Sequence, residues 1–472
     1  MRRSLFLGIL LLAPAVLGNP STYVFKNVTA ITLSNDTPLE NATVLVSGEE
    51  ITDVTTDETE PPEGAIVIDG TGKYLIPGLS DMHGHIGADF NSASQVSASH
   101  ASASKGERAD LLLYLLTGVT TVRNAVGSPQ QLALARAIDA HELLGPRLAT
   151  ASILLEGEDN VWPFSRIITN AEEGRTAVRE MVRDGYDYIK IYHTLSNETF
   201  YAVMDEAKNH GVRVIGHIPF TVGVEQAIAA GQSSIEHFRG YDIDGLAPHI
   251  LAKDGGRSAE RFGSWLNMSD ARMDELVATT AEAGTWNCPT FVVNDMLAQA
   301  EHLDKYADHP MAIYMPPAML SAFENSALKD IFSPESRAML AEVQPQMLKF
   351  LKKLHDAGAL MLTGTDTAPS VVPGFTLIDE LRFFERAGLT RLQLLKTSSQ
   401  NAAAFLGDGD TRGSIQAGMT ADLVLLGANP LDDLNHLWRV EGVMADGRWA
   451  TRGDLLTQLK TIVYSENNSV TN

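Results

Sequence analysis

Short apolar runs alternate with helix-like stretches through the middle of the chain. Eight runs are typical of buried strands: 79–85, 120–125, 147–152, 188–192, 213–218, 233–238, 285–291 and 360–366. Apolar positions at helical spacing lie between most of them, and several of these stretches end in glycine, a common helix stop. Alternating strands and helices predict an α/β fold with a parallel sheet. Eight such units favour a (β/α)8 TIM-like barrel, and a doubly wound open sheet is the alternative.

The two ends of the chain carry a different pattern, in which short β-like runs are separated by turn residues. Residues 23–69 contain several such runs, and a second group follows residue 412. Two β-rich flanks around a long middle predict a small β-sandwich domain formed by both chain ends. The expected boundaries are a signal peptide at 1–18, the β-sandwich at 19–76 and 408–455, the barrel at 77–407 and a C-terminal tail at 456–472.

The first residues have the layout of a signal peptide. Arg2 and Arg3 precede an apolar run over residues 5–16, and Val16 and Gly18 are small enough for cleavage near Gly18. The run is shorter than the roughly 20 residues that span a bilayer, and no later stretch is long and apolar enough. We therefore expect an exported protein, secreted or periplasmic, without a membrane span. An uncleaved N-terminal anchor is the alternative.

The composition is that of an ordinary globular protein and narrows the range of partners. Hydrophobic residues make up 44% of the 472 positions, and the formal net charge is -23. An acidic surface argues against nucleic acid, because phosphate binding needs a basic face. We expect a small-molecule substrate and leave homo-oligomer formation open. The single cysteine, Cys288, excludes an internal disulfide, and its apolar neighbours favour a buried structural thiol over a nucleophile.

Six polar side chains fall at the C-terminal ends of five of the predicted strands: His83, His85, Lys190, His217, His237 and Asp366. In a parallel barrel all strand C-termini open onto one face, where active sites form. His83 and His85 are two residues apart and point to the same side of a strand. One histidine at a strand end is more often a core residue, but six polar residues at the same relative position are hard to explain by packing. We therefore predict a metal site.

The residue types restrict the metal and its chemistry. Histidine and carboxylate ligands without cysteine suit zinc, manganese, iron or cobalt. Lys190 is different, because an ammonium group repels a cation. It is either an ordinary charged lysine beside a mononuclear site, or a deprotonated lysine that reacts with CO2 to give a carbamate bridging two ions. Burial in the apolar run 188–192 lowers a lysine pKa and favours the carbamate.

Asp366, in the segment LTGTDTAP, is the candidate catalytic residue. Metals lower the pKa of bound water towards ~7. A carboxylate beside that water can take its proton during attack and pass it to a leaving amine. The alternative role for Asp366 is the N-cap of a following helix.

The segments LIPGLSDMHGHIG, YIKIY, GHIPFTVGVEQAIAAGQSSIEH and LTGTDTAP resemble the signature segments of the amidohydrolase superfamily. The likeness is to its branch of imidazolonepropionase-like proteins and zinc-dependent prolidases and carboxypeptidases, and it runs from about Tyr23 to Arg452. It implies a (β/α)8 barrel beside a β-sandwich and two divalent metal ions, with zinc as the first choice. It also implies that Lys190 is N6-carboxylated and bridges the ions, which points away from imidazolonepropionase itself.

The resemblance implies a role for each of the other side chains. His83, His85 and Asp366 would bind the more buried ion. His217 and His237 would bind the second ion. Asp366 would also be the proton shuttle.

The chain departs from this resemblance after the lysine, where many relatives carry a glycine-rich run and this sequence reads YHTLSNETF. Tyr192 and His193 would then face the pocket. By position, Arg239 and Thr367 are the other candidates for substrate contact. Arg239 follows His237 and is placed to clamp a substrate carboxylate. An external salt bridge is the alternative role for Arg239.

These observations predict an exported, metal-dependent amidohydrolase. The expected substrate is a dipeptide or an N-acyl amino acid, whose amide bond a metal-activated hydroxide would cleave. A cyclic amide, a lactone or another ester is the alternative within enzymes, because the same water serves each. The alternative from another class is a catalytically dead, secreted binding protein on the same barrel. A dead barrel usually loses a ligand, whereas all six positions are filled here.

Overall fold

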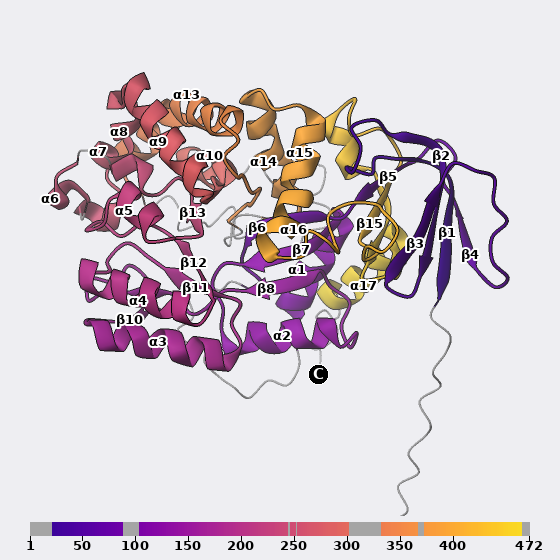
Figure 1. Ribbon diagram of the computed structural model, residues 1–472, viewed down its shortest axis with the longest axis horizontal. Coiled ribbons are helices and arrows are strands. Elements are labelled where there is room, and N and C mark those ends of the chain that lie inside the picture. The colour runs from indigo at the N-terminus through magenta and orange to yellow at the C-terminus, as the bar shows by residue number, and fades with distance from the viewer. Residues whose placement is uncertain are drawn as a thin grey trace, which may run out of the picture.

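The computed structural model describes residues 21–87, 103–243, 246–251, 253–301, 332–366 and 372–464. The expected signal peptide and the candidate contact Thr367 lie outside these residues. The chain has an α/β fold with two parts. Figure 1 shows a β-sheet at one end of the molecule and parallel strands with helices in the rest.

An eight-stranded sheet combines strands from both ends of the chain. Its strands are β1 (Thr22–Ala30), β2 (Leu39–Ser47), β3 (Glu50–Thr55), β4 (Ile66–Asp69), β5 (Tyr74–Pro77), β15 (Leu423–Leu426), β16 (Val440–Ala445) and β17 (Arg448–Thr451). β5 and β15 pair antiparallel, with Leu75 opposite Leu425, so this pair joins the N-terminal strands to the C-terminal ones. Phe25 and Val44 are fully buried in a core that belongs to this sheet.

The middle of the chain forms two parallel sheets, with the orders β6-β7-β8 and β10-β9-β11-β12-β13-β14. Their strands are β6 (Leu79–Gly84), β7 (Val119–Asn124), β8 (Arg147–Thr150), β9 (Leu155–Glu156), β10 (Arg166–Ile167), β11 (Tyr188–Ile191), β12 (Arg213–Gly216), β13 (Ser234–Glu236) and β14 (Trp286–Cys288). A bridge between Ala151 and Tyr188 links the two sheets. Every residue of β6, β7 and β11 is buried, which is typical of a parallel sheet covered on both faces.

Seven of the eight expected strands of the middle region lie within or beside their predicted ranges. The eighth, 360–366, is shorter than predicted, because only Met361 is paired, in a bridge to Asn287 of β14. On the other side, the N–H of Met82 in β6 donates to the carbonyl of Thr363 at 2.9 Å. The segment therefore runs between β14 and β6, although it forms no regular strand.

Helices follow most of these strands and begin where the sequence offers a cap. Ser104 forms a capping box with Glu107 at the start of α1, and Gly185 ends α3 with a left-handed φ of 94°. Leu455 and Leu459 of α17 are buried, so the expected tail begins inside a packed helix. The helices are α1 (Lys105–Leu116), α2 (Pro129–Asp139), α3 (Ala171–Asp184), α4 (Asn197–Asn209), α5 (Val224–Ala229), α6 (Pro248–Leu251), α7 (Ala259–Phe262), α8 (Ser264–Asn267), α9 (Asp270–Ala283), α10 (Phe291–Ala298), α13 (Pro334–Asp356), α14 (Phe375–Arg386), α15 (Arg391–Thr397), α16 (Gln400–Leu406) and α17 (Arg452–Tyr464), with 3-10 turns η1 (Tyr241–Ile243), η2 (Lys253–Gly256) and η5 (Leu434–Trp438).

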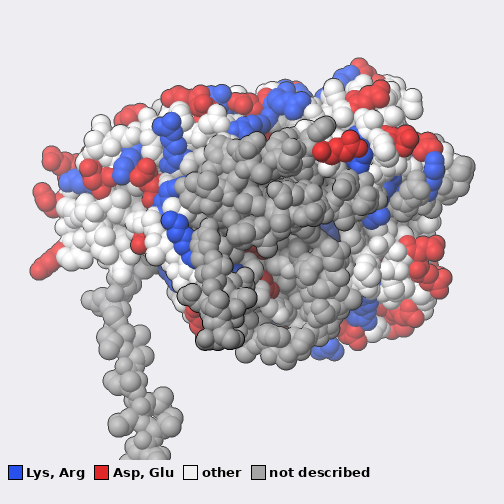
Figure 2. Space-filling view, turned by 180° about the vertical axis from the view of Figure 1, so that it is seen from behind, with Lys and Arg blue, Asp and Glu red and all other residues white. Residues whose placement is uncertain are grey.

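The described surface carries charges of both signs. Figure 2 shows acidic and basic side chains spread across the described part of one face. Among the described residues, no helix has both the length and the apolar character needed to cross a bilayer.

Candidate metal centre

The candidate ligands lie where parallel strands end. His83 lies in β6 and Lys190 in β11, whereas His85, His217 and His237 directly follow β6, β12 and β13. Parallel strands point their C-terminal ends to the same edge of a sheet. Side chains that are far apart in the sequence can therefore meet there.

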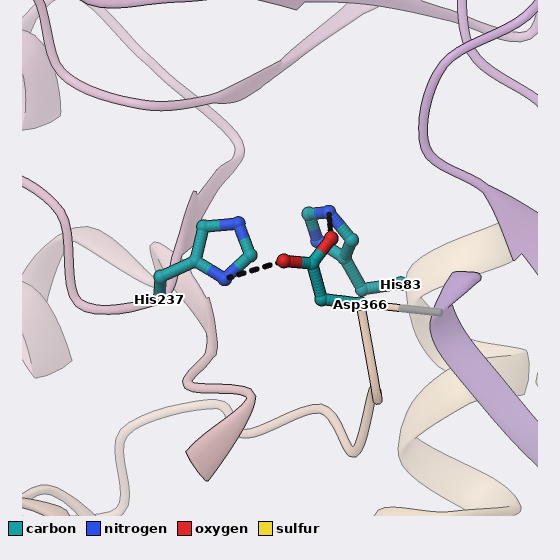
Figure 3. A group of neighbouring side chains, drawn as sticks. All are labelled: His83, His237 and Asp366. Carbon is teal, nitrogen blue, oxygen red and sulfur yellow. Dashed lines mark ion pairs between the residues drawn. The ribbon is translucent and has the colours of Figure 1, made fainter. Parts of the chain in front are cut away.

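The carboxylate of Asp366 has three histidines around it. His83, His237 and Asp366 present ligand atoms that lie within 4.8 Å of one another (Figure 3). Nε2 of His83 lies 3.4 Å from Oδ1 of Asp366, and Nδ1 of His237 lies 3.9 Å from Oδ2. Nε2 of His85 lies 3.0 Å from the same Oδ1. The structure thus brings together residues from both ends of the middle region.

His217 and Lys190 extend this group. The ring centroid of His217 lies 4.8 Å from that of His237. Burial lowers the pKa of Lys190 to about 8. Burial and then the charge of Lys190 lower the pKa of His83 to about 4, and the same lysine charge also acts on His217 and His237. His217 thus joins the histidines around Asp366, and Lys190 lies near enough for its charge to act on three of them.

The backbone at this cluster is unusual at two positions. Asp366 and His237 have φ values of 54° and 58°, in the left-handed region that residues other than glycine rarely adopt. Such conformations are concentrated at functional sites, where surrounding contacts hold them. One such contact is the N–H of Asp366, which donates to the carbonyl of His83 at 2.6 Å.

Asp81, a residue that sequence reasoning missed, joins the two segments that carry these ligands. Its buried carboxylate accepts hydrogen bonds from the N–H groups of His83 at 3.1 Å and Thr365 at 3.0 Å. It also accepts from the hydroxyl of Thr365 at 2.6 Å. This one side chain fixes the spacing between β6 and Asp366. The signal in the sequence was a charged residue inside a predicted buried strand, two positions before His83.

A second buried carboxylate, Glu236, holds the ring of His83. Its Oε2 lies 2.7 Å from Nδ1 of His83. Arg123 donates to both carboxylate oxygens of Glu236, at 2.9 and 2.8 Å, and to the hydroxyl of Ser234 at 3.0 Å. Burial alone would raise the pKa of Glu236, but Arg123 and His83 outweigh it and hold the pKa well below its usual range. Glu236 is therefore a charged acceptor.

The same reasoning applies to Asp366. Burial would raise the pKa of this carboxyl, but His237, the hydrogen bond from His85 and the nearby His83 hold it well below its usual range. Asp366 is therefore ionised at neutral pH. Its carboxylate oxygens then act only as acceptors.

These protonation states show that the cluster fits a metal ion. Because Glu236 only accepts, Nδ1 of His83 must donate, and Nε2 of His83 presents a lone pair to Asp366. Because the pKa of His83 is lowered to about 4, Nε2 carries no proton at neutral pH and cannot donate a hydrogen bond to Oδ1 of Asp366, 3.4 Å away. Two facing acceptors repel each other unless a cation lies near both. Imidazole and carboxylate donors suit zinc, manganese, iron or cobalt.

Comparison with known proteins decides the family. Residues 74–450, which are most of the chain, match the amidohydrolase family. The chain belongs to this family. This protein is therefore a hydrolase that acts on carbon–nitrogen bonds.

Individual relatives cover nearly all of this amidohydrolase. It is 24% identical over 460 residues to ochratoxinase from Aspergillus niger, with 85% of this chain and 82% of that protein covered. Bottromycin amidohydrolase has a TM-score of 0.72 and 24% identity, covering 94% of this chain and 90% of that one. An Xaa-Pro dipeptidase with bound methionine in its active site has a TM-score of 0.67 and 22% identity, covering 91% and 100%. The two structural likenesses show a shared fold.

In this amidohydrolase, the residues expected to contact substrate differ in their surroundings. His193 is buried, and its Nε2 lies 2.8 Å from Nδ1 of His217. Its Nδ1 is buried without a hydrogen-bond partner among the described residues. The ring of Tyr192 lies 4.1 Å from that of His217, centroid to centroid. His193 is therefore placed to orient His217.

Arg239 has an ion-pair partner, but the pair is largely buried and is not the external salt bridge of the alternative role. Its Nη1 donates to Oδ2 of Asp242 at 2.9 Å, and the buried Arg261 contacts the same carboxylate at 3.2 Å. Two guanidinium groups thus share one carboxylate. Arg257 lies over the ring of Trp162 at 5.7 Å and has no ion pair among the described residues. This corner of the site carries an excess of positive charge.

Cys288 is the structural thiol that the sequence favoured. It is fully buried, and burial raises the pKa of its thiol well above the usual value. A thiol that stays protonated is a poor nucleophile.

The ion pair between Arg123 and Glu236 leads to a stability prediction. Glu236→Gln leaves the guanidinium of Arg123 buried without an anion, and we expect it to lower the free energy of unfolding of the metal-free protein by about 3–5 kcal/mol. Urea denaturation of the chelated protein checks this value. As a control, Glu385→Gln removes a half-exposed carboxylate paired with Arg391 and should cost less than about 1 kcal/mol. An equal loss for the two variants would contradict a special role for the buried pair.

Proposed function

We propose that this amidohydrolase is an exported, metal-dependent enzyme that cleaves the amide bond of a dipeptide or an N-acyl amino acid. The observation that carries the proposal is the approach of three histidines to one carboxylate. Nε2 of His83 and Nε2 of His85 lie 3.4 and 3.0 Å from Oδ1 of Asp366, and Nδ1 of His237 lies 3.9 Å from Oδ2. Imidazole and carboxylate donors grouped in this way are typical of a metal site. The family supplies the bond type, because amidohydrolases act on carbon–nitrogen bonds.

The cluster divides into two sets of ligands. His83, His85 and Asp366 would hold one ion, and His217 and His237 would hold the second. When bound, such ions lower the pKa of water towards ~7 and polarise the carbonyl of the substrate. Glu236 and His193 would keep the rings of the first and second set in place, because outer hydrogen bonds fix the orientation of ligating histidines.

Lys190 would join the two sets as a carbamate. The residue is 2% exposed, and burial lowers the pKa of its amine to about 8, so a useful fraction is neutral near pH 7. The neutral nitrogen attacks CO2, one proton is released, and the product is an anion with two oxygens in place of a cation. Such an anion suits a position among histidines and metal ions better than an ammonium group does.

Asp366 would move the proton during the reaction. Its carboxylate is ionised, so it can accept a proton from the attacking water. It can then deliver that proton to the nitrogen of the leaving amine as the amide bond breaks. The contact with His85 at 3.0 Å keeps the carboxylate turned towards the centre.

The charge near the site supports a substrate that carries a carboxylate. Arg239 and Arg261 share one anion, Asp242. Burial is the main cause of the low pKa of His193, and the charges of these two arginines and of Arg257 lower it further. A free carboxylate of an amino-acid product would balance this excess.

The candidates for substrate contact remain Tyr192, His193, Arg239 and Thr367. The names prolidase and Xaa-Pro dipeptidase on structural relatives fit the same substrate type. Arg239 would meet the substrate carboxylate from its place beside Asp242.

The architecture around the site completes the proposal. We infer that the two parallel sheets and the segment 360–366 close into a (β/α)8 barrel, supported by the Ala151–Tyr188 bridge and the contacts between that segment and β6. The sheet from both chain ends would be the β-sandwich. Residues 1–18 would direct export of the protein.

A substrate screen tests this function. We expect the protein supplied with zinc to release a free amino acid from at least one member of a panel of dipeptides and N-acyl amino acids, measured as new primary amine. Treatment with a chelator should reduce the rate to background, and zinc should restore it. Hydrolysis of lactones or esters alone would favour the ester alternative. Tight binding of panel members without turnover would favour a binding protein.

A further inference from the structure

Thr290 stands at the start of α10 but does not cap it. In the described helices that begin with a serine, threonine or asparagine N-cap, such as α9 after Ser269 and α15 after Thr390, the side chain commonly accepts a hydrogen bond from its own helix. Thr290 makes no such bond and has a φ of 48°, which is rare for a β-branched residue. Its conformation therefore needs another explanation.

The hydroxyl of Thr290 contacts a candidate ligand instead. It lies 2.5 Å from Nδ1 of His237, and both side chains are buried. The ring of His237 is thereby held at the end of β13, where Asp366 and His217 approach it. A hydroxyl in this position fixes the rotation of an imidazole ring without adding charge.

A residue from another helix takes the capping role that Thr290 leaves open at the start of α10. Oε2 of Glu380, in α14, accepts the N–H of Val292 at 2.7 Å. Glu380 is fully buried, its Oε1 lacks a partner of hydrogen-bond geometry, and no cation pairs with it among the described residues. A carboxyl in this setting is costly to bury.

We propose that Thr290 and Glu380 act together as positioning residues for His237. Glu380 accepts the N–H of Val292 in the first turn of α10, so Thr290 is free to keep its left-handed conformation and give its hydroxyl to His237. This inference rests on the proposed function, in which His237 is a metal ligand. Glu380 lies on the helix that follows the Asp366 segment, so it links three successive strand–helix units of the site.

The affinity of the metal-free protein for zinc, measured by competition with a coloured chelator, tests this pairing. Thr290→Val keeps the shape but removes the hydroxyl, and we expect zinc affinity to fall about 10- to 100-fold. Glu380→Leu should cause a similar loss. Without Glu380, the hydroxyl of Thr290 would turn from His237 to the free N–H groups of α10. The double variant should lose little more than either single variant, since both act through the same contact.

Three further variants separate positioning from stability. Thr290→Ser retains the hydroxyl and should bind zinc as the unaltered protein does. Glu380→Gln retains an acceptor for the N–H of Val292, and its zinc affinity should be close to that of the unaltered protein. This variant still tests the proposal if Glu380→Leu does not fold. Thr390→Val makes the same chemical change at a cap that serves its own helix, so it should lower the melting temperature and leave zinc affinity unchanged. Normal zinc affinity in Thr290→Val would overturn the proposal.

A second measurement needs no metal. In protein with nitrogen-15-labelled histidines, the Nδ1 resonance of His237 should shift in Thr290→Val and in Glu380→Leu, but not in Thr390→Val. Absence of zinc binding by the unaltered protein would refute the proposed function. An unchanged His237 resonance in the two site variants would refute the positioning role alone.

Discussion

Asp366→Asn should reduce amide hydrolysis by about 10²- to 10⁴-fold, the range expected when a general acid–base group is lost. Asparagine has nearly the same size and keeps one oxygen that can face His83 and His85. It cannot accept a proton at neutral pH, so water attack and amine departure both lose their proton carrier. The rate constant for turnover, measured with the best substrate of the screen, is the quantity to compare.

The metal content of the same variant separates catalysis from assembly. The substituted asparagine can still offer an amide oxygen, so elemental analysis should show nearly unchanged metal. A variant that retains its metal and hydrolyses substrate at a substantial fraction of the original rate would remove Asp366 from the mechanism. As a control, Asp379→Asn changes an aspartate that is paired with Arg382 on α14 and should leave the rate within about twofold.

Lys190→Ala should lower the metal content from about two ions to about one per chain and abolish most of the activity, because two-metal sites need a group that binds both ions. In the unaltered protein, mass spectrometry under native conditions should show the added mass of one CO2. That mass should disappear on mild acid treatment, since a carbamate loses CO2 when its nitrogen is protonated. It should also be absent from Lys190→Ala.

The pH dependence gives an independent check on Lys190. Only the neutral amine reacts with CO2, and burial has lowered its pKa to about 8. At a fixed concentration of dissolved CO2, metal-free protein should therefore become carboxylated faster as the pH rises towards 8, and little faster above it. A single tightly bound ion in active protein, together with an unmodified Lys190, would leave a mononuclear site as the correct description.

The meeting of the histidines could be predicted from the sequence because they lie at or directly after the ends of parallel strands. His83, His217 and His237 each close an apolar run, and parallel strands end on one edge. The fold class followed from the same alternation of strands and helices. The strand at 360–366 was overestimated, because the turn needed to aim Asp366 back at β6 leaves only Met361 regularly paired.

The supporting residues could not be predicted in the same way. Arg123 and Glu236 are 113 positions apart, and neither occupies a position that periodicity distinguishes from core. Thr290 and Glu380 are linked only through the first turn of α10. Charged residues inside apolar strands were the available signal, and they point to a buried partner without identifying it.

The pairing of β5 with β15 sets a condition on how this enzyme is made. Pro77 lies opposite Leu423, and β6 with its histidines begins directly after β5. When only the first half of the chain has been synthesised, β15 does not yet exist, and β5 lacks the strand that pairs with it. A nascent chain therefore reaches its final form late in synthesis, and removal of the last strands should affect the centre through β5 even though no ligand is lost.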